Sequence, residues 1–150
     1  KTYYPFKSIL SGLWLAVVFA TLAWSEDTAS DQDGSALMSE ASLGEPFASV
    51  SIPSEIDPVR AMKACVRAAL GRKWDIVTKQ DDILKINLKQ KGWDATVYFV
   101  VKDDVVVLYS DSYIVNKKTG ERKKKRDPEG WLRNLEKDVG VFMDREAYLE

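Results

Sequence analysis

Four short segments in which apolar and polar side chains alternate constrain the fold of this chain most strongly. They lie at 74–78, 84–88, 95–101 and 105–110. Short turn signals separate them, so consecutive segments are expected to form hairpins. Pairing Val101 with Val106 and Leu84 with Phe99 gives compatible registers that place one apolar set on a single sheet face. This predicted core face consists of Leu84, Ile86, Leu88, Ala95, Val97, Phe99, Val101, Val106 and Leu108.

A helix signal stands on either side of these strands. Asp57-Pro58 and Asp127-Pro128 both combine an N-cap residue with proline at the first helical position. Apolar residues at helical spacing follow each signal, and Gly71 suits the end of the first helix. The two stripes are Val59, Met62, Cys65, Val66, Ala69 and Leu70, and Trp131, Leu132, Leu135, Val139, Phe142 and Met143. The predicted fold class is α+β: a two-layer sandwich in which a four-stranded antiparallel meander has one helix before and one after it, both packed on one face.

Residues 1–25 have the features of a signal peptide. Lys1 and Lys7 precede an apolar run at 9–22, and small residues at Ala23 and Ser25 fit a cleavage site before Glu26. The run is about 14 residues long, whereas about 20 are needed to span a bilayer core. The sequence therefore predicts an exported protein, periplasmic or secreted, with an uncleaved membrane anchor as the alternative. No cysteine lies directly after the run, so a lipoprotein is not expected.

The charge distribution divides the rest of the chain into two parts. Residues 26–57 hold eight acidic residues and no Lys or Arg, and their small, polar composition predicts a flexible acidic linker. Residues 58–150 hold 20 Lys or Arg against 15 Asp or Glu, and their length suits one small α+β domain. The overall formal charge of −1 hides this division.

The residue types present exclude several chemistries. The chain contains no His, which removes the usual general base of nucleophilic catalysis and the commonest neutral metal ligand. Cys65 is the only cysteine, so an intrachain disulfide is impossible and neither a structural zinc site nor any other cofactor is expected. The position of Cys65 on the first apolar stripe predicts a buried core thiol. A reactive exported thiol is the alternative.

One carboxylate is a candidate for catalysis. Asp111 lies just beyond the last predicted strand, between the hydroxyl groups of Ser110 and Ser112. A carboxylate-dependent hydrolase needs a second carboxylate opposite the first, and no sequence signal identifies one. Local hydrogen bonds at the end of a strand also account for the pattern. The sequence therefore favours a non-enzymatic role, with a small hydrolase that uses Asp111 as the alternative.

A basic run precedes the second helix and is the first candidate binding site. The segment 116–126, NKKTGERKKKR, is predicted to be a loop and holds seven cationic side chains: Lys117, Lys118, Arg122, Lys123, Lys124, Lys125 and Arg126. Such a run attracts anionic lipid headgroups or acidic glycans. A solvated connecting loop is the alternative. The run has no aromatic residue to stack on bases, and with export predicted, nucleic acid is not an expected partner.

The predicted registers also gather apolar side chains on the sheet face opposite the helices. Tyr98, Val100, Val107 and Tyr109 are neighbours there. Such a patch is typical of a surface that contacts a protein partner or a second copy of the chain. Partial cover by the preceding linker is the alternative. Tyr98 and Tyr109 are therefore the second candidate site.

Four short motifs occur in a characteristic order: RKWDIV at 72–77, KGWDATV at 91–97, LYSDS at 108–112 and GWLRNLE at 130–136. Over about 58–139 the chain resembles a family of small exported bacterial proteins and lipoproteins of unknown function. The resemblance implies a helix, a strand meander and a C-terminal helix, and it brings no catalytic residue. This chain differs by lacking a lipobox cysteine and by containing the Lys-rich run. The combined prediction is an exported module for binding or envelope interaction.

Overall fold

The computed structural model describes residues 38–149. The predicted signal peptide at 1–25, and the predicted linker as far as residue 37, lie outside the described residues. No helix within 38–149 is long and apolar enough to cross a membrane. The elements below therefore belong to the predicted domain and to the last part of the predicted linker.

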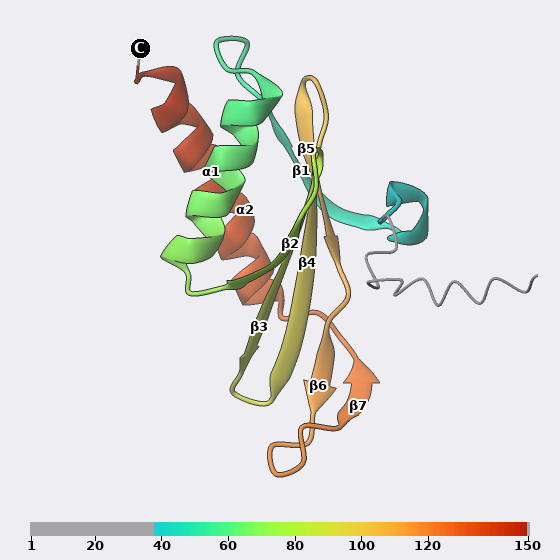
Figure 1. Ribbon diagram of the computed structural model, residues 1–150. Helices are drawn as coiled ribbons and strands as arrows, with labels where there is room; N and C mark the ends of the chain where they lie inside the picture. Colours follow the sequence, from blue (N-terminus) through green and yellow to red (C-terminus); the bar gives the residue numbers. More distant parts are fainter. Residues whose placement is uncertain (1–37, 150) are drawn as a thin grey trace, which may run out of the picture. The chain divides into compact units, whose positions relative to one another are not determined.

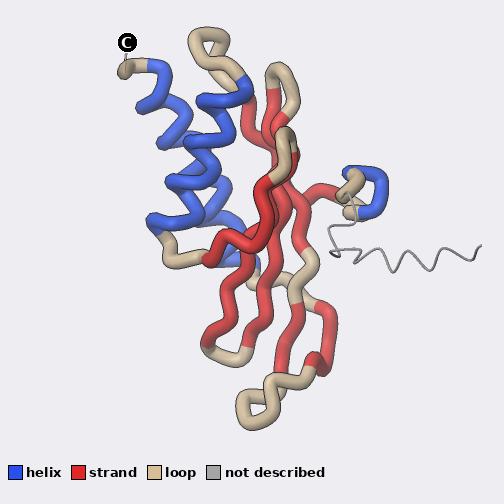
Figure 2. Tube along the Cα trace, in the orientation of Figure 1, coloured by secondary structure: helices blue, strands red, loops and turns tan. Residues whose placement is uncertain are grey.

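The described part of the chain folds into an antiparallel sheet with two α-helices (Figures 1 and 2). The strands are β1 Pro46–Ser51, β2 Asp75–Lys79, β3 Ile83–Gln90, β4 Trp93–Val101, β5 Val105–Ser110, β6 Tyr113–Val115 and β7 Arg122–Lys125. The helices are the short 3-10 helix η1 Glu40–Ser42, α1 Pro58–Gly71 and α2 Glu129–Ala147. The predicted α+β class is confirmed, but the sheet has seven strands within 38–149, where four were predicted.

The strand order in the sheet is β1-β5-β4-β3-β2, and β6 pairs with β4 and with β7. The predicted hairpin registers are confirmed, because Val101 lies opposite Val106 and Leu84 lies opposite Phe99. β1 pairs antiparallel with β5, which corrects the prediction of a flexible linker over the whole of 26–57. β1 was missed because it forms an edge of the sheet, where most of its side chains are exposed or half-buried and the sequence lacks a long apolar run.

The main core lies between the sheet and the two helices, which cover the same face of the sheet (Figure 1). Eight of the nine side chains predicted for this face are buried, and Leu88 packs against them half-buried. Helix α2 contributes the apolar residues predicted from its spacing: Leu132, Leu135, Val139 and Met143 are buried. The alternation of the strands therefore identified the core correctly.

The buried face of helix α1 is shifted from the predicted one, since Met62, Cys65 and Ala69 are buried as predicted but two other predicted residues are exposed. Asp57 caps it as expected, because its side chain accepts a hydrogen bond from the backbone N–H of Arg60 at 2.8 Å. Val59 and Leu70, however, are 66% and 56% exposed. Small side chains dominate the buried face, which holds Ala61, Met62, Ala64, Cys65, Ala68 and Ala69. Alanines allow close packing against the sheet and α2, and this outweighs the exposure of two larger apolar residues.

The start of helix α2 also differs from the prediction. The helix begins at Glu129, and the carbonyl of Pro128 accepts hydrogen bonds from Trp131 and Leu132. Asp127 does not cap it, since its carboxylate accepts a hydrogen bond from the Ser110 hydroxyl at 2.7 Å. At the other end of α2, the buried Glu146 forms ion pairs with Arg60 and Arg67 of α1. These pairs join the two helices.

Cys65 is fully buried, and burial raises the pKa of its thiol to about 12. We expect the native protein to resist alkylation by iodoacetamide, because thiolate is scarce and the sulfur is inaccessible. Cys65→Ser should lower the free energy of unfolding by about 1–3 kcal/mol, since it buries a hydroxyl. Cys65→Ala is the matched control and should cost about 1 kcal/mol. Alkylation as fast as that of free cysteine would contradict this interpretation.

Candidate functional site

The basic run forms an ordered β-hairpin, which corrects the prediction of a connecting loop. Strands β6 and β7 flank a tight turn, in which the N–H of Gly120 donates to the carbonyl of Asn116 at 2.7 Å and the N–H of Asn116 donates to the carbonyl of Glu121 at 2.8 Å. Gly120 has a positive φ of 74°, which favours glycine. We call residues 113–126 the basic hairpin. Its second strand was missed because all four of its residues are charged and exposed, so no alternation marks it.

The basic hairpin is fixed to the first residues of β4. Trp93 lies opposite Ile114 and Asp94 lies opposite Tyr113, and the N–H of Val115 donates to the carbonyl of Gly92 at 2.9 Å. On the other strand, the N–H of Arg126 donates to the carbonyl of Ser112 at 3.0 Å. The backbone bonds of β6 thus hold the hairpin to the main sheet, and the bond from Arg126 closes the hairpin at its base.

Arg122 is tied to this sheet by a buried carboxylate. Asp94 accepts hydrogen bonds from Asn87 Nδ2 at 2.8 Å and from Arg122 Nε at 3.1 Å, and the Arg122 guanidinium lies 4.4 Å from the centre of the Tyr113 ring. Burial alone would raise the pKa of Asp94, but the hydrogen bonds from Asn87 and Arg122 outweigh it and hold that pKa below its usual range. Arg122 therefore anchors the hairpin.

Lys125 is also paired within the domain, and its partner is Asp111. The Lys125 Nζ lies 3.1 Å from Asp111 Oδ1, and the hydrogen bond that it donates to this carboxylate raises the pKa of Lys125. The hydroxyl groups of Ser110 and Ser112 lie 2.8 Å apart, and the Ser110 hydroxyl donates a hydrogen bond to Asp127. Neither hydroxyl group is hydrogen-bonded to Asp111. The carboxylate of Asp111 is therefore paired with a lysine of the basic hairpin.

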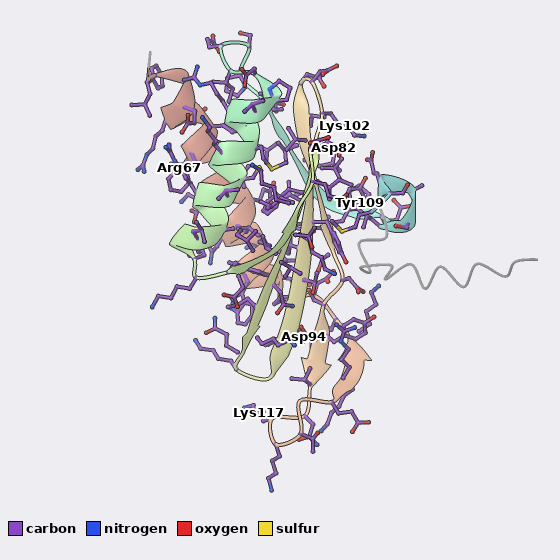
Figure 3. All side chains as sticks on the ribbon, in the orientation of Figure 1. Arg67, Asp82, Asp94, Lys102, Tyr109 and Lys117 are labelled. Carbon is purple, nitrogen blue, oxygen red and sulfur yellow. The ribbon has the colours of Figure 1, made fainter. Side chains whose placement is uncertain are left out.

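Five cations of the basic hairpin form no ion pair within residues 38–149. They are Lys117, Lys118, Lys123, Lys124 and Arg126, and all are exposed. Lys124 lies opposite Ile114 and Lys125 lies opposite Tyr113, so these two neighbours point to opposite faces of the hairpin. Figure 3 shows Lys117 at the far end of the hairpin and Asp94 at its attachment to β4.

A pocket of about 460 Å³ lies between the ends of the β3–β4 hairpin and the basic hairpin. Its lining includes three cations, Lys89, Lys91 and Lys117, together with Trp93 and Asn116. The side chain of Lys117 lies over Gly92, where an added Cβ would be 3.0 Å from Lys117 Cε. Lys89, Lys91 and Trp93 were not predicted as site residues, because no sequence signal shows that two hairpins end side by side.

The second candidate site, Tyr98 and Tyr109, is covered by the segment 38–43. Met38 and Leu43 pack on a small apolar cluster of Ile83, Val100, Val107 and Tyr109. Tyr109 is buried, and its hydroxyl donates to Glu40 Oε1 at 2.6 Å. Tyr98 is half-buried beside Lys85, whose Nζ lies 5.5 Å from the ring centre. Cover by the preceding segment, the alternative considered from the sequence, therefore describes this face.

Glu40 anchors this covering segment electrostatically. Its carboxylate contacts Lys102 Nζ at 2.8 Å in addition to Tyr109. Hydrogen bonds from Lys102 and Tyr109 lower the pKa of Glu40, and the same carboxylate raises the pKa of Tyr109 to about 12. Because the pKa of Glu40 is lower in the folded form, the carboxylate stabilises the folded form at pH values above the ordinary glutamate pKa of about 4.3. This contribution is lost as the pH falls through the pKa of the folded form.

We therefore expect acid to release the covering segment. In a pH series followed by NMR, the amide signals of residues 38–43 should shift toward unstructured values below about pH 4. The contacts contribute about 1 kcal/mol at neutral pH, since Glu40 is partly exposed. Glu40→Gln should loosen the segment at neutral pH and abolish the transition, whereas Glu45→Gln should retain it. An unchanged acid transition in the Glu40 variant would refute this role.

Comparison with known proteins finds no family model, no curated protein and no solved structure that matches this chain. The geometry therefore carries the functional argument: an ordered basic hairpin, a cationic pocket beside it, and a sheet face covered by the chain's own segment.

Proposed function

We propose that the protein is an exported, non-enzymatic binding module that contacts an anionic component of the bacterial cell envelope through its basic hairpin. The observation that carries this proposal is the set of five exposed cations without an ion pair within residues 38–149, held on a hairpin whose backbone is fixed to the sheet. A rigid array of cations binds anions with less loss of conformational entropy than a flexible loop.

The distribution of charge supports the same proposal. Residues 58–150 carry 20 Lys or Arg and 15 Asp or Glu. The segment 116–126 contains seven of these cations and one acid, Glu121, which leaves 13 cations and 14 acids in the rest of the domain. The positive excess therefore lies entirely in the basic hairpin. An anionic surface or polymer is drawn to that end of the domain.

The exported location rests on the sequence. The apolar run and small residues before Glu26 predict a signal peptide, and the resemblance to small exported bacterial proteins agrees with it. The non-enzymatic role rests on the absence of His from the chain and on the pairing of Asp111 with Lys125.

The proposal predicts salt-sensitive binding of the full chain to vesicles that contain phosphatidylglycerol. Changing Lys118, Lys123 and Lys124 to Gln should weaken this binding about a hundredfold at low salt, because each cation near an anionic surface contributes about 1 kcal/mol. Changing Lys63, Lys79 and Lys137 to Gln removes the same charge elsewhere and is the matched control. Co-sedimentation with anionic and neutral vesicles over a salt series measures both effects.

Two results would count against the proposal. Equal weakening by the two triple variants would mean that only net charge matters. Binding of neither anionic vesicles nor an anionic oligosaccharide by the unaltered chain would leave the basic hairpin without a ligand of the proposed kind.

A further inference from the structure

Three tryptophans from different elements meet beside the basic hairpin. Trp74 precedes β2, Trp93 begins β4 and Trp131 lies in the first turn of α2. The Trp131 ring centre lies 6.4 Å from that of Trp74, edge to face at 88°, and 6.3 Å from that of Trp93, tilted at 56°. Trp74 is buried, whereas Trp93 and Trp131 are half-buried. Trp131 therefore combines support from the core with a surface open to solvent, and the half-buried Trp93 lies against it.

Three pockets adjoin at these rings. The pocket between the two hairpin ends, of about 460 Å³, is lined by Trp93. A second, of about 290 Å³, is lined by both Trp93 and Trp131, and a third, of about 270 Å³, by Trp131 and Trp74. The first and second pockets share Trp93 and the second and third share Trp131, so the three hollows are neighbours along these rings. We call these three neighbouring pockets the tryptophan groove.

The polar lining of the tryptophan groove mixes cations, amides and carboxylates. Lys89, Lys91 and Lys117 line the first pocket, and Arg126 of the basic hairpin lines the second. The amide groups are those of Gln90, Asn116 and Asn134, and the carboxylates are those of Asp94, Asp127 and Glu129. A ligand that fits this lining needs negative charges, hydroxyl donors for the carboxylates, and flat apolar faces for the rings.

We propose that the tryptophan groove binds a linear acidic oligosaccharide, a chain of sugars that bear carboxylates. The C–H faces of the sugar rings would lie against Trp93 and Trp131, hydroxyl groups would donate to Asp127 and Glu129, and sugar carboxylates would face Lys117 and Arg126. This inference rests on the proposed function and names the chemical class of its anionic ligand. Asp127 and Glu129 disfavour a polyphosphate, because its phosphate groups repel the two carboxylates and provide few hydroxyl donors for them.

The test compares three soluble probes and one membrane probe on the full chain. The probes are tetragalacturonate, tetraglutamate with the same charge but no sugar rings, maltotetraose with sugar rings but no charge, and phosphatidylglycerol vesicles. Tetragalacturonate should bind about tenfold more tightly than either soluble control, and it should shift the indole N–H signals of Trp93 and Trp131 in NMR spectra.

Two substitutions locate the site. Trp131→Ala should weaken tetragalacturonate binding about tenfold while vesicle binding changes less than about twofold. Trp131 also contacts the core, so its substitution could disturb folding. The second variant is therefore Asn134→Ala, at an exposed position of α2 that lines the third pocket. This change should weaken tetragalacturonate binding about threefold.

The outcomes separate this inference from the proposed function. The inference would be overturned if tetraglutamate or maltotetraose bound as tightly as tetragalacturonate. It would also be overturned if Asn134→Ala had no effect and the Trp signals did not shift. Either result would leave anion binding by the basic hairpin intact. Binding to vesicles alone would mean a membrane surface instead of a glycan. Failure of every anionic probe would overturn both.

Discussion

The pairing of strand β4 along both of its edges is the constraint on which the rest of the structure depends. One edge pairs with β3 from Ile83↔Val100 to Gln90↔Trp93. The other edge pairs first with β5 and then with β6, after the chain bends at Asp111, whose N–H donates to the carbonyl of Thr96 at 2.9 Å. Without β6, the start of β4 would present an unpaired edge. The basic hairpin is thus an extension of the main sheet.

Because of this attachment, the seven cations of the basic hairpin have two different roles. Arg122 and Lys125 have carboxylate partners in the domain and hold the hairpin in place, whereas the other five cations form no ion pair within residues 38–149. The same attachment brings Lys117 and Arg126 to pockets lined by Trp93. Charge and aromatic surface, which lie far apart in the sequence, therefore become parts of one candidate site only through β4.

Local signals in the sequence were enough to predict the central hairpins, the Asp57 cap and the core stripe of α2, because alternation, turn length and capping involve neighbouring residues. Contacts between distant segments were not predictable in this way. Asp127 carries a good capping signal, yet the fold places Ser110 within hydrogen-bond reach of it. Likewise, β1 and β7 have little apolar alternation of their own, and they become strands because an edge is available to pair with. The tryptophan groove likewise depends on contacts between three segments that lie far apart in the sequence.

Amide hydrogen exchange of the basic hairpin tests the central claim most directly, namely that the cations occupy fixed positions on an extension of the sheet. The N–H of Val115 donates to the carbonyl of Gly92 at the start of β4, and the N–H of Arg126 donates to the carbonyl of Ser112 at the base of the hairpin. Residue-resolved NMR should therefore find both amides protected to a degree comparable with β3 and β4, and the exposed turn amide of Thr119 unprotected. Exchange of Val115 and Arg126 at the rate of an unstructured peptide would mean that the run is a mobile loop, and would contradict the account.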